Sequence, residues 1–166
     1  NWIECMYVFK ILKMPNFKIY IENRYESWKI FKDDTFDDVK YDIDPMKQKL
    51  FSDDVFNDDD GFKIIHSTTR NYKSIPGVLV LDKNKTYGKK KNQFLYRCIP
   101  DDGRLPIFLI PYEIKNMGFS KKMENKYVTF NFESWDNEHP YGILSNTIGD
   151  VDKLENFYEY QLYCKS

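Results

Sequence analysis

The stretch that decides the fold reads LYRCIPDDGRLPIFLIPYEIKN from Leu95 to Asn116 and KYVTFNFESWDNEHPYGILSNTIGD from Lys126 to Asp150. Short runs of β-branched and aromatic residues alternate there with turn-forming Asp, Asn, Gly and Pro, as is typical of strands joined by tight turns. Together with a similar run in front, the strand-like segments are Pro76–Leu81, Phe94–Ile99, Pro106–Ile110, Tyr127–Phe132 and Ile143–Ile148. Five short strands with the longest connection between the third and fourth predict a small barrel of the oligonucleotide-binding (OB) kind.

The preceding part of the chain, from Phe17 to His66, predicts another barrel of less regular pattern. Alternating apolar and polar residues indicate strands that are separated by polar or strongly acidic loops. These strands are Phe17–Ile21, Ser27–Phe31, Val39–Ile43 and Phe62–His66. The polar stretch STTRNYKS, from Ser67 to Ser74, is expected to connect the two barrels. The predicted fold class is therefore all-β, with two small OB-like barrels in tandem.

The end of the chain changes to a helical period. Asp152 and Glu155 have the spacing of a capping box, in which two side chains satisfy free amides at a helix start. Apolar residues then follow at helical spacing: Leu154, Phe157, Tyr158 and Leu162. A short amphipathic helix of about three turns is expected to run to Lys165.

The motif residues of the second predicted barrel occur in a characteristic order. They are Asp102, Arg104, Pro106 and Ile110, then Trp135, Pro140 and Gly142, and finally Thr147, Gly149, Asp150 and Asp152. This pattern resembles the second cold-shock-like domain of the ribonuclease II/R family and of the catalytic subunit of the eukaryotic exosome. In that family the domain lies immediately before the catalytic domain. Earlier in the chain, Leu50–Phe56 looks like the family's H-G-D-x-V step, with Asp53 in place of the Gly and Phe51 in place of the His.

The resemblance implies a domain organisation for the whole chain. An N-terminal extension would cover 1–15, a degenerate first cold-shock-like OB domain 16–68, a linker 69–74, and a second cold-shock-like OB domain 75–150. The helix of 151–166 would lead toward a catalytic domain beyond Ser166. The high ratio of Lys to Arg, 21 to 4, is also similar to that of family versions in large DNA viruses.

Charge is distributed unevenly along a chain whose net charge is −1. The segment from Ile75 to Lys122 contains ten Lys or Arg residues and four Asp or Glu residues. The segment from Met123 onward contains three Lys or Arg residues and eight Asp or Glu residues. A positive surface is therefore expected on the second barrel, although the whole chain is nearly neutral.

The cysteine spacing and the hydropathy pattern indicate in which kind of cellular compartment the chain is expected. Cys5, Cys98 and Cys164 are odd in number and widely spaced, which disfavours a disulfide framework and a zinc site. There is no run of eighteen apolar residues, so the sequence predicts no membrane span. A reducing, cytoplasmic compartment is the simplest interpretation.

No catalytic motif is recognisable in the sequence. Family members cut RNA with Mg²⁺ held by clustered aspartates of the catalytic domain, and two-metal sites need such oxygen ligands close together. The acidic runs from Asp33 to Asp38 and from Asp58 to Asp60 fit neither that motif nor an EF-hand, and solvated loop acids are the simpler interpretation. We expect the chain to need no cofactor, with Mg²⁺ confined to the catalytic domain that the resemblance implies.

RNA binding is the function that the residues favour. OB barrels stack bases on exposed aromatic rings and run phosphates along a basic groove. The candidate RNA-binding residues are Lys85, Tyr87, Lys89, Lys90, Lys91, Phe94, Tyr96, Arg97 and Arg104.

The sequence leaves an alternative open at several of these positions. Phe94 and Tyr96 share one strand face, which is either core or displayed surface. The three consecutive lysines either bind phosphate or form a soluble hairpin tip. The Arg104 guanidinium either clamps a phosphate or pairs with a neighbouring carboxylate. Trp135 fits a core position better than a stacking platform.

The sequence leads to two hypotheses about function. The first is a single-stranded RNA-binding module of a ribonuclease R-like 3′-to-5′ exoribonuclease, which guides RNA to a hydrolytic domain of the same polypeptide. The alternative is a stand-alone OB-fold interaction protein that has lost the nuclease domain. The degenerate first barrel and its many acids would suit protein contacts in such a protein. The expected partners are single-stranded RNA and that nuclease domain, and no membrane.

Overall fold

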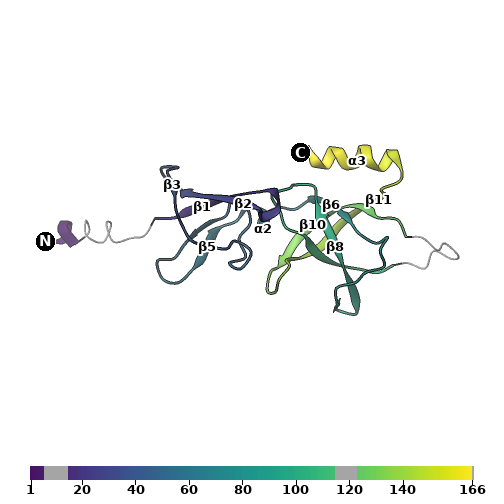
Figure 1. The fold of residues 1–166 in the computed structure, drawn as a ribbon, viewed down its shortest axis with the longest axis horizontal. Coiled ribbons are helices and arrows are strands. Elements are labelled where there is room, and N and C mark those ends of the chain that lie inside the picture. The colour runs from purple at the N-terminus through teal and green to yellow at the C-terminus, as the bar shows by residue number, and fades with distance from the viewer. Residues whose placement is uncertain (6–14, 115–122, 166) are drawn as a thin grey trace. The chain divides into compact units, whose positions relative to one another are not determined.

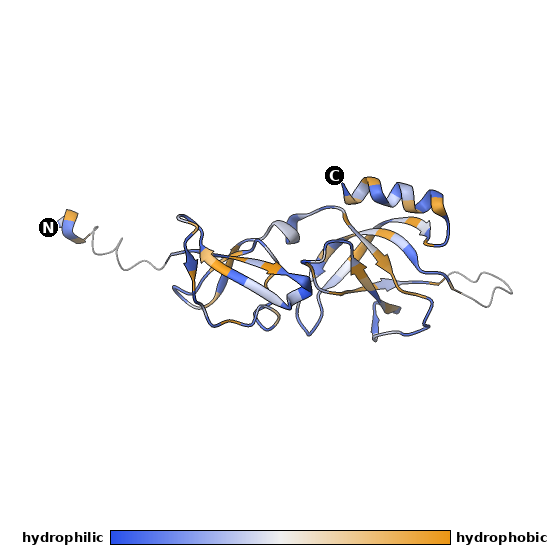
Figure 2. Cartoon of the chain, turned by 45° about the horizontal axis from the view of Figure 1, so that its top comes forward, coloured by the Kyte–Doolittle hydropathy of each residue, from blue (hydrophilic) through white to orange (hydrophobic). Residues whose placement is uncertain are grey.

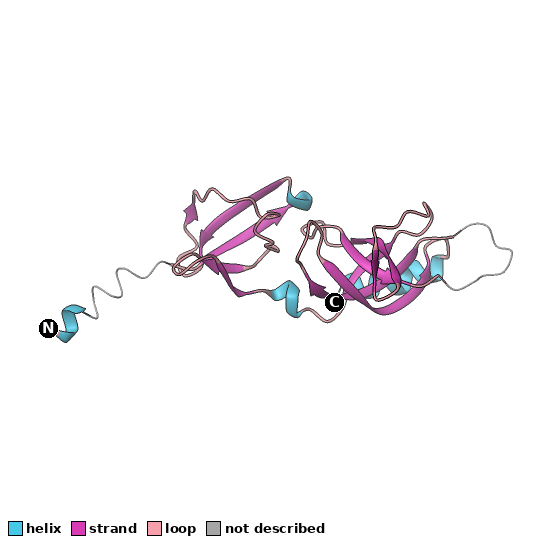
Figure 3. Cartoon of the chain, turned by 90° about the horizontal axis from the view of Figure 1, so that it is seen from below, coloured by secondary structure: helices cyan, strands magenta, loops and turns pink. Residues whose placement is uncertain are grey.

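Strands are the predominant regular structure of the fold (Figure 3). The computed structural model describes residues 1–5, 15–114 and 123–165. The chain forms two compact units, Asn1–Thr69 and Arg70–Ser166. Each unit has its own sheet, and several of the strands are labelled in Figure 1.

The first unit is a five-stranded sheet in the order β3-β2-β1-β4-β5. Its strands are β1 Phe17–Glu22, β2 Ser27–Lys32, β3 Asp38–Val39, β4 Val55–Asn57 and β5 Lys63–His66, and the short 3-10 turn η1 Asn23–Tyr25 joins β1 to β2. β1 and β2 pair along their whole length, and alternate residues of β1 face the core. The predicted alternation of this hairpin is thus realised.

The core of the first unit is aromatic. Phe56 is fully buried, and its ring lies within 6 Å of three others, with centroid distances of 5.9 Å to Phe17, 5.7 Å to Tyr41 and 5.3 Å to Phe62. Such tilted and edge-on ring pairs add to the stabilisation that burial alone supplies.

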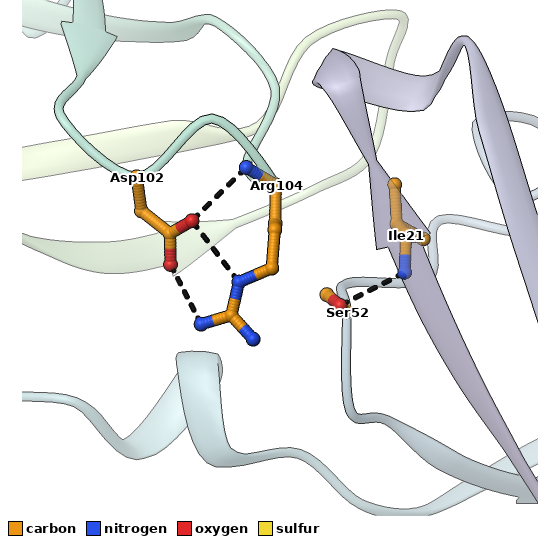
Figure 4. A network of polar contacts seen from close by, with 4 residues as sticks. All are labelled: Ile21, Ser52, Asp102 and Arg104. Carbon is orange, nitrogen blue, oxygen red and sulfur yellow. Dashed lines mark hydrogen bonds and ion pairs between the residues drawn. The ribbon is translucent and has the colours of Figure 1, made fainter.

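The loop before β4 is buried against β1 instead of lying in solvent. The Ser52 hydroxyl accepts the Ile21 N–H at 2.9 Å, as Figure 4 shows, and the Asp54 carbonyl accepts the Ile19 N–H at 3.2 Å. Asp53, which stands where the family's motif has Gly, adopts φ +70°. Asp tolerates this left-handed conformation better than most residues, so the substitution is compatible with the same turn.

Two strand predictions for the first unit need correction. The predicted strand Val39–Ile43 is only the two-residue β3, because the chain leaves β2 after Val39. β4 was not predicted. The edge strands β3 and β5 do not pair with each other within the described residues, so the structure shows a sheet here and not a closed barrel.

The second unit contains a closed five-stranded barrel. Its strands are β6 Ile75–Leu79, β7 Lys89–Lys90, β8 Gln93–Pro100, β9 Phe108–Tyr112, β10 Lys126–Ser134 and β11 Tyr141–Asp150. The sheet order is β6-β10-β11-β9-β8-β7, and an additional pairing of β6 with β8 closes the ring. β7 extends β8 as a hairpin outside the ring, and β9 and β11 run parallel. All five strands predicted for this unit are present, and the short helix α2 Thr68–Asn71 occupies part of the predicted linker.

The barrel interior depends on close packing at a motif glycine. The rings of Phe108 and Phe130 lie 4.8 Å apart, and both side chains are fully buried. A Cβ at Gly142 would stand 2.9 Å from the Phe130 ring and 3.0 Å from the Asn131 carbonyl oxygen. Only glycine allows β11 to approach β10 this closely. Trp135 is buried, as expected.

The C-terminal helix α3, Leu154–Cys164, was correctly predicted, but its start and its buried face were not. Lys153 is the N-cap residue and makes no side-chain cap, so the capping box of Asp152 and Glu155 does not form. The ring of Tyr160 stacks on Tyr127 of β10 at 4.4 Å and is the buried contact.

The helix residues expected on the buried face are exposed instead: Leu154, Phe157, Tyr158 and Leu162. On this helix, hydrophobic bands alternate with hydrophilic ones in Figure 2. Among the described residues, none of the helices combines the length and apolar character that crossing a bilayer requires.

Candidate nucleic-acid interface

The β7–β8 hairpin is a tight and well-paired projection from the barrel. Lys91 and Asn92 form its two-residue turn with φ of +50° and +66°, which is the type I′ geometry that suits the twist of paired strands. Beyond β7, the Tyr87 N–H donates to the Leu95 carbonyl and the Leu95 N–H donates to the Gly88 carbonyl, both at 2.9 Å. The ladder therefore fixes Tyr87 beside β8.

A hollow of about 160 Å³ lies next to this hairpin. We call it the barrel hollow, and its lining residues are Val80, Lys83, Lys85, Tyr87, Arg97 and Ile99. The Val80 N–H donates to the Arg97 carbonyl at 2.9 Å, so the backbone joins two sides of the hollow. An apolar floor with cationic side chains around it can accept a flat, apolar group attached to an anion.

Tyr87 is the aromatic surface of the barrel hollow. Its side chain is half-buried, and the Lys85 ammonium lies 5.2 Å from its ring centroid. A cation over one part of a ring face is a modest attraction at an exposed site, about 0.5–1 kcal/mol, so a base can displace it. Lys83, Lys85 and Arg97 are all exposed and carry positive charge at neutral pH.

Lys89 and Phe94 form a second aromatic and cationic contact at the end of the hairpin. They are a cross-strand pair, with the Lys89 ammonium 4.6 Å from the Phe94 ring centroid, and Phe94 is 45% exposed. The register of β8 with β9 runs without a shift, so Phe94, Tyr96 and Cys98 share one face of the strand, as predicted. Tyr96 and Cys98 are buried, whereas Phe94 remains displayed.

Burial excludes Tyr96 from the predicted stacking surface. The side chain is 4% exposed, and its ring packs edge-on against Tyr112 at 6.3 Å. Burial, and then the nearby Tyr112, raise the pKa of its hydroxyl. Of the two placements that the sequence left open for Tyr96, the structure shows the core, which leaves the side chain little exposed surface for a base.

Two predicted cations are engaged within the protein. The Lys90 ammonium lies 2.7 Å from a Glu133 carboxylate oxygen and 5.0 Å from the Tyr141 ring centroid. Arg104 donates to both carboxylate oxygens of Asp102, from Nε at 3.1 Å and from Nη2 at 2.9 Å (Figure 4). Of the two roles open for Arg104, the structure shows pairing with a carboxylate.

The structure thus brings together Lys85, Tyr87 and Arg97, with Lys89, Lys91 and Phe94 on the adjoining hairpin. It adds Lys83, which was counted as charge but not as a site residue, and the apolar floor of Val80 and Ile99. The position of Lys83 two residues before Lys85 was the only signal in the sequence. Within the described ranges, no group of three or more His, Cys, Asp or Glu is arranged to hold a metal ion.

The fold and the site define a β protein with a closed five-stranded barrel that displays aromatic and cationic side chains beside one hairpin. No protein-family model and no curated protein matches the chain. Among solved structures, it is similar to yeast Ssd1, which is described as a pseudonuclease, with 14% identity and a TM-score of 0.61. The match covers 98% of this chain and 26% of that one, so the chain spans about a quarter of its neighbour's length. At this identity the similarity establishes the fold. The neighbour is a yeast protein and gives no support to a viral origin.

Proposed function

We propose that the chain binds single-stranded RNA through its second unit, an OB-like barrel of cold-shock type. The observation that carries the proposal is Tyr87, half-exposed over the barrel hollow and surrounded by Lys83, Lys85 and Arg97. One base would stack on the ring, while neighbouring phosphates would lie against the cations.

The strand order supports the assignment of this barrel to the OB type. Counted along the chain, the ring strands β6, β8, β9, β10 and β11 are joined around the barrel in the order first, second, third, fifth, fourth. This is a Greek-key arrangement of five strands, as OB barrels have. In that fold, the hairpin after the first strand borders the oligonucleotide-binding face.

The role of the bound RNA depends on what accompanies the barrel. The motif resemblance to the ribonuclease II/R family favours delivery of RNA to a catalytic domain of the same polypeptide. The similarity to yeast Ssd1, described as a pseudonuclease, favours a second candidate in which the chain holds RNA without cutting it. RNA binding by the barrel is common to both.

Stacking on Tyr87 can be tested with a fluorescein-labelled oligouridylate of about 16 nucleotides, the upper site size of one OB fold. Tyr87→Ala should cost about 1–3 kcal/mol of binding free energy while leaving the salt dependence of the affinity nearly unchanged. The matched control is Tyr158→Ala, because Tyr158 is an exposed tyrosine of α3 in the same unit. Equal affinities of the two variants for the oligouridylate would show that RNA does not bind at the barrel hollow.

A further inference from the structure

The pairing of β2 with its outer neighbour stops halfway along the strand. β3 pairs with β2 only at Ile30 with Val39 and at Phe31 with Asp38. Residues 40–42 are not in a strand, so the Ser27–Lys29 part of β2 has β1 on one side and no strand on the other within the described residues. Such an unpaired edge presents backbone donors and acceptors that another extended chain can use.

A groove of about 530 Å³ lies along this open edge. We call it the β2–β3 groove, and its lining is Trp28, Lys29, Ile30, Asp38, Val39, Lys40, Tyr41 and Asp42. Its volume falls within the range of about 300–1,000 Å³ that is usual for ligand-binding clefts.

Two aromatic residues give the groove its binding character. Trp28 is 37% exposed on β2, although burial of an indole is strongly favourable. Tyr41 stands on the other wall and is held by the core, with its ring 5.2 Å from Phe17 and 5.7 Å from Phe56. One wall is therefore pre-organised and the other keeps an indole available to a partner.

Charge around the β2–β3 groove favours a basic occupant. The lining itself is balanced, with Asp38 and Asp42 against Lys29 and Lys40. The adjoining β2–β3 turn adds Asp33, Asp34 and Asp37 and no base. The Tyr41 hydroxyl is 3.5 Å from an Asp58 carboxylate oxygen, and burial together with this carboxylate raises the pKa of Tyr41.

The acidic excess extends to the unit as a whole. Residues 16–69 carry eight Lys/Arg and thirteen Asp/Glu. A phosphate backbone would be repelled here, whereas a lysine-bearing or arginine-bearing chain would be attracted.

We propose that the β2–β3 groove binds an extended, basic segment of a partner protein, which adds to the open edge of β2 as a further strand. About three residues of the segment would pair with the edge, and alternate side chains would pack against Trp28 and Tyr41. Its basic side chains would be attracted by Asp42 of the lining and by the acidic excess of the unit. This site lies in the first unit and does not depend on RNA binding by the second.

The test uses the full chain and a fluorescein-labelled peptide of alternating Lys and Val, with a Glu and Val peptide as its acidic counterpart. Binding is measured by fluorescence anisotropy, and the contact is located from backbone amide shifts. We expect the basic peptide to bind about tenfold or more tightly than the acidic one, with the largest shifts at residues 27–29.

Three variants make the test specific. Asp38→Lys with Asp42→Lys should weaken the basic peptide about tenfold, and Trp28→Ala should weaken it about fivefold. Asp136→Lys with Glu138→Lys changes the charge equally at exposed positions of the second unit, outside the lining, and should change affinity by no more than about twofold.

Several results would overturn the proposal. They are absence of basic-peptide binding, equal binding of both peptides, equal effects of the two charge reversals, or amide shifts confined to other strands. If Trp28→Ala instead weakens binding of the oligouridylate, the groove is a nucleic-acid site and the peptide proposal fails.

Discussion

The two units use similar numbers of strands to make surfaces of opposite electrostatic character. The first has an open sheet, a buried loop along β1 and an excess of acids. The second closes its ring and, from residue 70 onward, carries fifteen Lys/Arg against twelve Asp/Glu, with several of the bases around one aromatic ring. A net charge of −1 conceals this division. For binding, the local arrangement of charges is therefore more informative than the net charge of the chain.

The largest predicted effect tests whether the two cores are separate. Phe56→Ala in the first unit and Phe130→Ala in the second each remove a fully buried ring, which costs about 3–5 kcal/mol of unfolding free energy. We expect each substitution to destabilise only its own unit. Urea unfolding can be followed through the buried Trp135 in a background with Trp2→Phe and Trp28→Phe, so that the fluorescence reports the second unit.

In that background Phe130→Ala should strongly lower the urea concentration at the midpoint of unfolding detected by Trp135 fluorescence. Phe56→Ala should leave this midpoint nearly unchanged. Equal shifts of the Trp135 midpoint by the two variants would mean that the chain unfolds as one cooperative body, and the comparison of two independent cores would then fail.

A smaller predicted effect is the pH dependence of the unfolding free energy of the second unit. Burial raises the pKa of the Cys98 thiol far above its ordinary value of 9.0, so the folded barrel keeps the thiol protonated where the unfolded chain ionises it. The stabilising contribution is complete below pH 9 and is lost as pH rises above it, at about 1.4 kcal/mol per pH unit. The second unit should therefore lose stability between pH 9 and 10.

The control for this prediction is Cys98→Ala, which removes the titrating group. Between pH 7 and 10, the Trp135-detected unfolding free energy of the wild type should fall by about 1.4 kcal/mol more than that of the variant. An identical fall in both proteins would show that the thiol does not couple to folding of the barrel.

Sequence reasoning predicted the regular parts of both units because alternation and turn residues are local signals. It identified β1, β2 and β8 to within about two residues. It overextended β3, because alternation continues through Ile43 although the chain has already left the sheet. It missed β4, a three-residue strand that follows acidic loop residues. The capping-box spacing was present, but α3 begins one residue too late for Asp152 to cap it.

The candidate site was harder to predict because its decisive contacts are between residues distant in sequence. Periodicity placed Phe94 and Tyr96 on one face, but only closure of the barrel determines that Tyr96 is enclosed. The Lys90 partner, Glu133, is 43 residues away. The Arg104 partner is two residues away, and there the sequence had already proposed a carboxylate as one of two choices.

The most direct test of RNA binding by the second unit is a salt titration of oligouridylate affinity with two matched charge reversals. One is Lys83→Glu with Lys85→Glu at the barrel hollow, and the other is Lys47→Glu with Lys63→Glu at exposed positions of the first unit. Both change the net charge equally. Each phosphate contact of a single strand contributes about −0.7 to the slope of log affinity against log salt, so the first variant should flatten the slope by about 1.4. The second should leave it at the wild-type value. Equal slopes for the wild type and the barrel-hollow variant, or equal flattening by both reversals, would contradict RNA binding at the barrel hollow.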